Sequence, residues 1–248
     1  MKRIEILYQD SNIIIIDKPE GLLSVPFEGC RVKTARDILE QVLRKKGEYS
    51  QKYRPLAVHR LDRDTSGVMM FATNECAQKI IMDKWHSMVK SRKYVALAEN
   101  PTNFFKYGIL PDSGIIDDSL SYNAYNVGYV AERGLKKEMP HGTGRGKDVR
   151  SVGIKTENEI PARTHFKIVK RGGRFSVFEL ELDTGRKNQI RAHLASKGYP
   201  IAGDKNYRAH TNPFDRMCLH ARTLEYTDPW TGEEKKFEVL EPKEWWTV

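Results

Sequence analysis

Cysteines and long apolar stretches are both scarce in this sequence. Its 248 residues include three cysteines, Cys30, Cys76 and Cys218, which are far apart and form no CxxC pair. So small a set argues against a disulfide framework or a zinc knuckle and suits a reducing cytosol. The longest apolar run, residues 13–16, is far too short to span a bilayer. The charged first residues, MKRIEILYQDSN, lack the apolar segment of a signal peptide. We therefore expect a cytoplasmic protein without a membrane partner.

Acidic residues are fewer than basic ones. Lys and Arg total 42 against 33 Asp and Glu, which leaves a formal net charge of +9. This excess favours polyanionic partners such as nucleic acid, because each phosphate that is neutralised releases counterions. With 39% hydrophobic residues the chain can bury a sizeable core, and its length predicts one large domain or two fused lobes.

A nucleotide-binding P-loop is missing. The stretch GTGRGK ends at Lys147, but His141 stands where the first glycine of the motif is required. Asp148 replaces the hydroxyl residue that would bind magnesium, so we reject this motif. No HExxH motif and no Cys/His set is present either, and we expect no bound metal.

The order of predicted elements favours an α+β fold over an α/β fold. Helices and strands are mixed without the strict alternation that indicates a parallel sheet. Hydrophobic periodicity, N-caps and turn residues indicate the elements. The expected strands are residues 4–8, 13–17, 67–72, 93–98 and 175–183 with a hairpin within 218–240, and the expected helices are residues 34–46, 74–89 and 187–198.

Residues 107–160 differ from the rest of the chain. They hold several glycines and a basic stretch, KKEMPHGTGRGKDVR, so we expect a few short strands and a basic loop near residues 140–150. Five basic side chains there are candidates to grip phosphates, or form only a solvated loop: Lys136, Lys137, Arg145, Lys147 and Arg150. If they grip RNA, neutralising them should flatten the salt dependence of RNA affinity.

The densest cluster of charged side chains is HRLDRDTSG, residues 59–67. Its Asp62 follows an apolar approach and precedes the apolar stretch GVMMFA, so we expect this aspartate at a strand end over the core. Arg60 and Arg63 favour the ionised carboxylate, which suits a nucleophile or a base. The alternative is a surface loop with local ion pairs. We expect His59 to bond to the backbone rather than to a metal.

Four stretches together resemble the RluA family of RNA pseudouridine synthases. HRLDRDTSGVMMFA is similar to the family signature, and DTGRKNQIRAHLASKGYPIAGDKNY (183–207) resembles its second motif. IIIIDKPEGLLSVP (13–26) and CLHARTLEYTDP (218–229) resemble its N-terminal and C-terminal segments. The four occur in the family's order over about residues 4–240.

This resemblance implies a fold, a reaction and a site. The fold would be a mixed, mostly antiparallel sheet with flanking helices and a central RNA-binding cleft. The family breaks the uridine N1–C1′ bond, rotates the uracil and rejoins it through C5 without a cofactor. Asp62 matches the catalytic aspartate, Tyr94 the tyrosine that lies against the base, and Arg191 the basic residue that pairs with the aspartate.

The resemblance also predicts how RNA is held. The target uridine would be flipped into a pocket, where a base stacked on Tyr94 gains about 1–3 kcal/mol. Separately from the resemblance, the closeness of Arg60 and Arg63 to Asp62 leads us to expect that they fill the vacated space or hold flanking phosphates. We expect a monomer of one catalytic domain, residues 1–248, without the N-terminal S4 domain of many relatives, and a structured ribosomal or transfer RNA as substrate.

Two departures from the family pattern and two rival functions remain. Arg92 stands where a lysine is usual, and Lys187 and Asn188 replace a threonine–histidine type pair. Because they do not touch the roles of the three matched residues, we expect them to bear on substrate choice more than on competence. One rival is a catalytically inactive RNA-binding module of the same fold. The other is a glycoside hydrolase that uses a carboxylate pair such as Asp62 and Asp64, which we judge the weaker because so many cations surround them.

Overall fold

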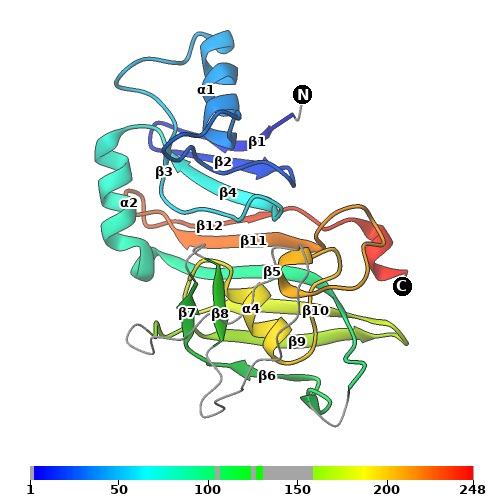
Figure 1. Cartoon of the computed structure of the whole chain (residues 1–248). Coiled ribbons are helices and arrows are strands. Elements are labelled where there is room, and N and C mark those ends of the chain that lie inside the picture. The colour runs from blue at the N-terminus through cyan, green and yellow to red at the C-terminus, as the bar shows by residue number, and fades with distance from the viewer. Residues whose placement is uncertain (1–2, 104–106, 124–126, 131–158, 248) are drawn as a thin grey trace.

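A computed structural model describes residues 3–103, 107–123, 127–130 and 159–247, and every structural statement below concerns these residues. Ten strands form one twisted sheet that carries helices on its faces (Figure 1). The strands are β1 (Glu5–Gln9), β2 (Ile13–Lys18), β3 (Leu56–Ala57), β4 (Ser66–Ala72), β5 (Val89–Glu99), β6 (Ser113–Ile116), β9 (Thr164–Arg171), β10 (Phe175–Leu182), β11 (Leu219–Thr227) and β12 (Glu234–Glu238). A separate hairpin joins β7 (Leu120–Tyr122) to β8 (Gly128–Val130).

The sheet is mostly antiparallel. Its order is β1-β2-β4-β11-β5-β10-β9-β6, with β12 paired to β11 and β3 paired to β4. The pairing of β4 with β11 is parallel and joins the N-terminal strands to the C-terminal ones. The α+β prediction is therefore confirmed, and so is the predicted hairpin near the C-terminus, which is β11 and β12.

The helices begin where the sequence predicts N-caps. Helix α1 (Ala35–Lys46) starts after Thr34, whose hydroxyl accepts from the amide of Asp37 in a capping box. Helix α2 (Glu75–Met88) starts after Asn74, whose side chain accepts from the amide of Ala77. Short 3-10 turns follow at Lys205–Tyr207 and Lys243–Trp246.

Three predicted elements need correction. Strand β5 begins at Val89, directly after α2, and is longer than the predicted 93–98 because its first half pairs with β11. The first four residues of β10 are buried. Because successive side chains point to opposite faces, both faces are covered here, and the strand is not half-buried as its alternating pattern predicts. Helix α4 (Gln189–Ser196) is shorter than 187–198, and its first six residues are all buried.

Hydrophobic clusters line both faces of the sheet and converge at its centre. One packs α1 against β2 and β4, and another packs α2 against the opposite face. A third lies between α4 and the C-terminal strands. Tyr94 contacts the first and the third, which places it where the two halves of the molecule meet.

Glycine is required at the parallel junction of the sheet. Gly67 has φ of +112°, and a Cβ atom there would lie 2.1 Å from the carbonyl oxygen of Ala221 in β11. Any side chain would push β4 and β11 apart directly beside the loop that carries Asp62.

The region 107–160 contributes short strands, as predicted, namely β6, β7 and β8. The five basic residues proposed there (Lys136, Lys137, Arg145, Lys147 and Arg150) lie outside the described residues. Among the described residues no helix is both long enough and apolar enough to cross a membrane.

Candidate active site

Asp62 lies in the loop that leads from β3 into β4. Leu61 beside it is buried, and Asp62 itself keeps 17% of its side-chain surface exposed. The amide of Thr65 donates to the carbonyl oxygen of Asp62 at 3.2 Å, which closes a tight turn before β4. The apolar neighbours thus anchor the loop in the core while the carboxylate faces solvent.

Residues at the end of β2 and in the loop after it form hydrogen bonds with the backbone on either side of Asp62. Lys18 is fully buried, and its ammonium donates to three backbone carbonyls, those of Pro19, Leu22 and Arg63, at 2.7–3.1 Å. The Ser24 hydroxyl donates to the carbonyl of Leu61 and accepts from its amide. These contacts give the DKPEGLLS segment a physical role, because they fix the backbone on both sides of Asp62.

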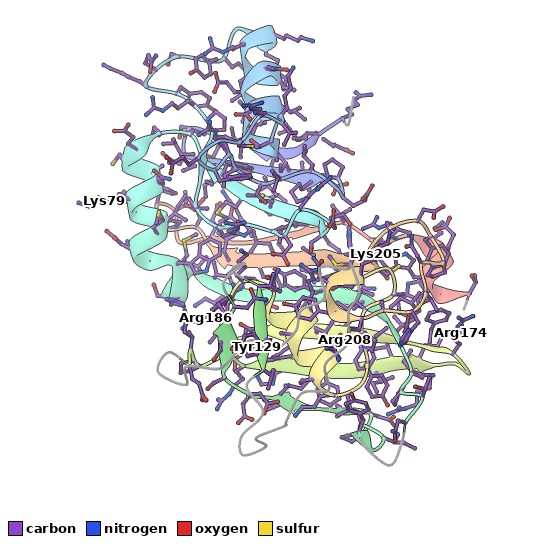
Figure 2. The ribbon with its side chains drawn as sticks, in the orientation of Figure 1. Lys79, Tyr129, Arg174, Arg186, Lys205 and Arg208 are labelled. Atoms are coloured by element: carbon purple, nitrogen blue, oxygen red, sulfur yellow. The ribbon has the colours of Figure 1, made fainter. Side chains whose placement is uncertain are left out.

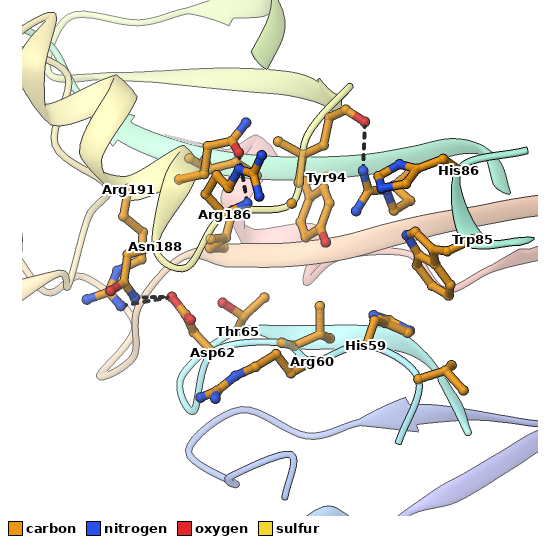
Figure 3. Close-up of a pocket in the computed structure, with 18 residues that line it drawn as sticks. His59, Arg60, Asp62, Thr65, Trp85, His86, Tyr94, Arg186, Asn188 and Arg191 are labelled. Carbon is orange, nitrogen blue, oxygen red and sulfur yellow. Dashed lines mark hydrogen bonds and ion pairs between the residues drawn. The ribbon is translucent and has the colours of Figure 1, made fainter. Parts of the chain in front are cut away.

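One carboxylate oxygen of Asp62 accepts two hydrogen bonds from the start of α4. The guanidinium of Arg191 donates through Nη1 to Oδ2 at 3.0 Å, and the side-chain amide of Asn188 donates to the same oxygen at 2.6 Å (Figure 3). Oδ1 accepts no hydrogen bond from the described part of the chain. The carboxylate is therefore held by one oxygen, and the other is available to a substrate.

Asn188 is able to make this contact because of its backbone. Its φ is 58° and ψ is 18°, a left-handed conformation that asparagine tolerates better than most residues. The sequence predicts that Asn188 bears on substrate choice more than on competence. The structure adds a contact that this prediction did not include, because the Asn188 side chain donates to Asp62 itself.

Arg191 is buried rather than placed at the helix edge as expected. It keeps 7% of its surface exposed, and its Nε and Nη2 donate to the two oxygens of buried Asp204 at 2.6 and 2.8 Å. Burial alone would lower the pKa of Arg191, but the hydrogen bonds and charge of Asp204, followed by the charge of Asp62, raise it above the usual range. Arg191 thus bridges two carboxylates and keeps its charge.

A cavity of about 320 Å³ opens beside Asp62. Tyr94 on β5 lines it, half-buried, with its phenol between the Asp62 loop and the strands (Figure 3). Burial raises the pKa of the Tyr94 phenol. The charge of Arg92 lowers this pKa and the charge of Asp62 raises it, and the net shift is upward, so the hydroxyl stays protonated at neutral pH. The aromatic ring and the carboxylate therefore face one shared space.

His59 is a structural neighbour of the cavity. Its Nε2 accepts from the amide of Met70 at 2.9 Å, which is the backbone bond expected from the sequence. Burial, with the nearby Arg92, lowers its pKa to about 3, so the ring is neutral. The indole of Trp85 lies over it, with ring centroids 5.0 Å apart.

The two arginines around Asp62 differ in placement. Arg60 is exposed and lines the cavity, whereas Arg63 is not among its lining residues. Arg63 instead points to the carbonyl of Gly21, at 3.4 Å, and to Asp64, at 3.8 Å. Other exposed basic side chains gather near α4: Arg186, Lys205 and Arg208 (Figure 2).

The carboxylate pair of a glycoside hydrolase does not form. Asp64 does not line the cavity, and its nearest charged partner is the exposed Arg63. Within the described ranges no three His, Cys, Asp or Glu side chains are grouped closely enough to hold a metal ion.

Sequence reasoning brought out Asp62, Tyr94 and Arg191, and the structure places all three at one cavity. It missed Asp204, Asn188 and Lys18 as partners of the site. Each of the three lies inside a stretch that resembles a family motif, which is the signal that could have found them. The bond between Asp204 and Arg191 joins residues 13 apart in the chain, and the bond between Asn188 and Asp62 joins residues 126 apart. A motif can therefore single out these residues, but it does not show which side chains they bond.

Comparisons with known proteins point to one family. A family model described as RNA pseudouridylate synthase matches residues 12–196. The chain is 30% identical over 243 residues to the uncharacterized RNA pseudouridine synthase YlyB of Bacillus subtilis, covering 97% of this chain and 70% of the relative. It is 31% identical to the ribosomal large subunit pseudouridine synthase D of Nitrosomonas europaea, covering 93% of this chain and 60% of the relative.

A solved structure shares the fold. Human RNA pseudouridylate synthase domain containing 4 superposes with a TM-score of 0.69 over 97% of this chain and 89% of the other, at 22% identity. The curated relatives are longer than this chain, which spans 58% to 70% of the length of five of them.

Proposed function

Because the chain belongs to the RNA pseudouridylate synthase family, we propose that it isomerises uridine to pseudouridine in structured RNA. One observation carries the proposal. A carboxylate, Asp62, faces a cavity lined by Tyr94 and is held through one oxygen by buried Arg191. This arrangement presents an ionised oxygen and an aromatic face to the same guest, which is what a flipped pyrimidine nucleotide requires.

Each side chain at the cavity has its own role in this proposal. Oδ1 of Asp62 acts on the nucleotide as nucleophile or base, while Arg191 and Asn188 hold Oδ2 and fix the orientation of the carboxylate. Tyr94 stacks on the uracil while the N1–C1′ bond is broken and the C5–C1′ bond is formed. The isomerisation conserves all atoms: the proton lost from C5 is balanced by one gained at N1.

In this proposal two arginines bind phosphates of the RNA strand. Arg60 does so at the cavity rim, and Arg63 does so further out. Lys187 lies near Arg60 and Asp62 but does not line the cavity. Burial, followed by the charge of Arg60, lowers its pKa. The relatives named as ribosomal large subunit synthases favour ribosomal RNA as the substrate, with transfer RNA as the alternative. We also propose that the chain acts in the cytoplasm as a monomeric single domain.

The test is conversion of uridine by the purified chain. Total RNA from cells that lack the gene would be incubated with wild type, Asp62→Asn or Asp64→Asn, and pseudouridines would be mapped. We expect wild type and Asp64→Asn to convert the same uridine, and Asp62→Asn to be slower by at least about 1000-fold. Binding of RNA by wild type without any conversion would instead support an inactive RNA-binding module.

A further inference from the structure

The cavity is larger than one target base needs. Cavities of roughly 300–1,000 Å³ take drug-sized ligands, and a pyrimidine ring is much smaller than these, yet the cavity here measures about 320 Å³. The two ends of the cavity carry different kinds of side chain. Asp62, Asn188 and Arg191 lie at one end, Trp85 and His86 lie at the other, and Tyr94 stands between them (Figure 3).

The distant end offers an aromatic platform. Trp85 comes from the last turn of α2, is half-buried, and packs against the core beneath that helix. The His59 ring packs against the indole, and because His59 is neutral and bonded to the backbone, this support is uncharged and fixed. His86, the next residue, is exposed at the same rim.

Two arginines supply positive charge to this cavity. Arg92 lines the cavity and uses Nη2 to donate to the carbonyl of Leu182 at 3.1 Å, which fixes its guanidinium beside Tyr94. Arg186 lines the cavity from the α4 side. A phosphate that links two adjacent nucleotides would meet these two cations if one base lay on Tyr94 and its neighbour at Trp85.

We propose that Trp85 and His86 form a second nucleotide subsite, which stacks an unpaired base adjacent to the target uridine. This inference rests on the proposed function. It defines the substrate class further: the target lies in a loop or single-stranded stretch where its neighbour can also leave the helix. A uridine inside a continuous duplex would leave this end of the cavity empty and would be a poor substrate.

The first experiment measures kinetics with matched variants. Trp85→Leu keeps apolar packing on the core but removes the aromatic face, and Trp85→Phe keeps a ring. Trp230→Ala is the control, because Trp230 is 38% exposed in the β11–β12 turn and does not line the cavity. On a hairpin RNA with the mapped target uridine in its loop, we expect Trp85→Leu to raise KM between about 5-fold and 150-fold, the range of one base stack. Trp85→Phe should restore most of this loss.

The second experiment observes the neighbouring base directly. Two versions of the hairpin carry 2-aminopurine on the 5′ or the 3′ side of the target uridine, and Asp62→Asn protein is used so that the RNA stays unconverted. Stacking on Trp85 should quench the 2-aminopurine fluorescence in one of the two RNAs, and the added change Trp85→Leu should remove that quenching.

The outcomes separate the two proposals. If wild type converts no uridine in any RNA, the proposed function fails. If wild type converts uridine but Trp85→Leu matches Trp230→Ala in KM and neither RNA is quenched, the second subsite is excluded while the enzyme stands. Equal loss in Trp85→Leu and Trp85→Phe, with the same fall in thermal stability, would show a packing role and would also exclude the subsite.

Discussion

A single guanidinium organises the polar side chains at the centre of this site. Arg191 donates to Asp204 through two nitrogens and to Asp62 through a third, so buried Arg191 and Asp204 are linked to the partly exposed carboxylate of Asp62. A buried ion pair of this kind is costly to break, because removing one member leaves the other charged and unsolvated. Asp204 thus positions Arg191, and Arg191 positions Asp62.

Neutralising Asp204 tests whether this carboxylate positions Arg191. Asp204→Asn keeps the size of the side chain but removes its charge, so we expect the free energy of unfolding to fall by about 3 kcal/mol. We also expect kcat to fall while KM changes little, because RNA contacts the rim rather than Asp204. Urea denaturation and steady-state kinetics measure the two effects. Asp64→Asn serves as the control, since Asp64 is 48% exposed and lies outside the cavity; equal effects of both changes would contradict the prediction.

At the scale of elements, the parallel pairing of β4 and β11 carries a hydrogen-bonded chain of its own. Arg216 donates to the Ser66 hydroxyl, which bonds Nδ1 of His220 at 2.8 Å. Since the carbonyl of Val239 can only accept, Nε2 of His220 carries the proton and donates to it at 2.8 Å. The pKa of His220 is lowered to about 4, mainly by burial. The charge of Arg216 lowers this pKa further, and the charge of Glu241 raises it.

This pKa makes the junction sensitive to acid. In the unfolded chain a histidine takes up a proton near pH 6.5, but His220 in the folded chain does not until about pH 4. The unfolded state therefore binds more protons between these values, and stability is lost as the pH falls through this window. His220→Gln removes the titrating group while keeping an amide that can both donate and accept.

The measurement is the free energy of unfolding at pH 7.5 and at pH 5.5. Wild type should lose about 1 kcal/mol more than His220→Gln between these two values. Urea titrations of both proteins at both pH values give the comparison. An identical loss in the two proteins would show that His220 titrates normally in the folded chain.

At the scale of the whole molecule, some exposed arginines line the cavity and others lie away from it. Arg60 and Arg186 line the rim, while the equally exposed Arg174 lies far from it at the β9–β10 turn (Figure 2). Each phosphate contact adds about 0.7–0.9 to the slope of log affinity against log salt concentration. The rim arginines should therefore contribute to this slope and Arg174 should not.

Alanine at these positions tests the arrangement. Arg60→Ala and Arg186→Ala should each flatten the salt slope by roughly 0.7–0.9, and Arg174→Ala should leave it unchanged. Arg60→Ala should also weaken RNA binding more than it slows turnover of RNA that is already bound. Fluorescence anisotropy at several salt concentrations and single-turnover kinetics supply the data. Equal slopes for all four proteins would place the RNA on another face.

The sequence by itself determined the elements, the α+β class and the family, because N-caps, strand periodicity and the four motif-like stretches are local patterns. It also brought out Asp62, Tyr94 and Arg191 through their resemblance to family motifs. Only the tertiary structure decided which atoms meet: that Asn188 shares an oxygen of Asp62 with Arg191, that Lys18 fixes the loop, and that Trp85 lies at the same cavity. These contacts join segments far apart in the chain, and hydrogen bonds across such separations depend on how the strands of the sheet are ordered, which no local pattern encodes.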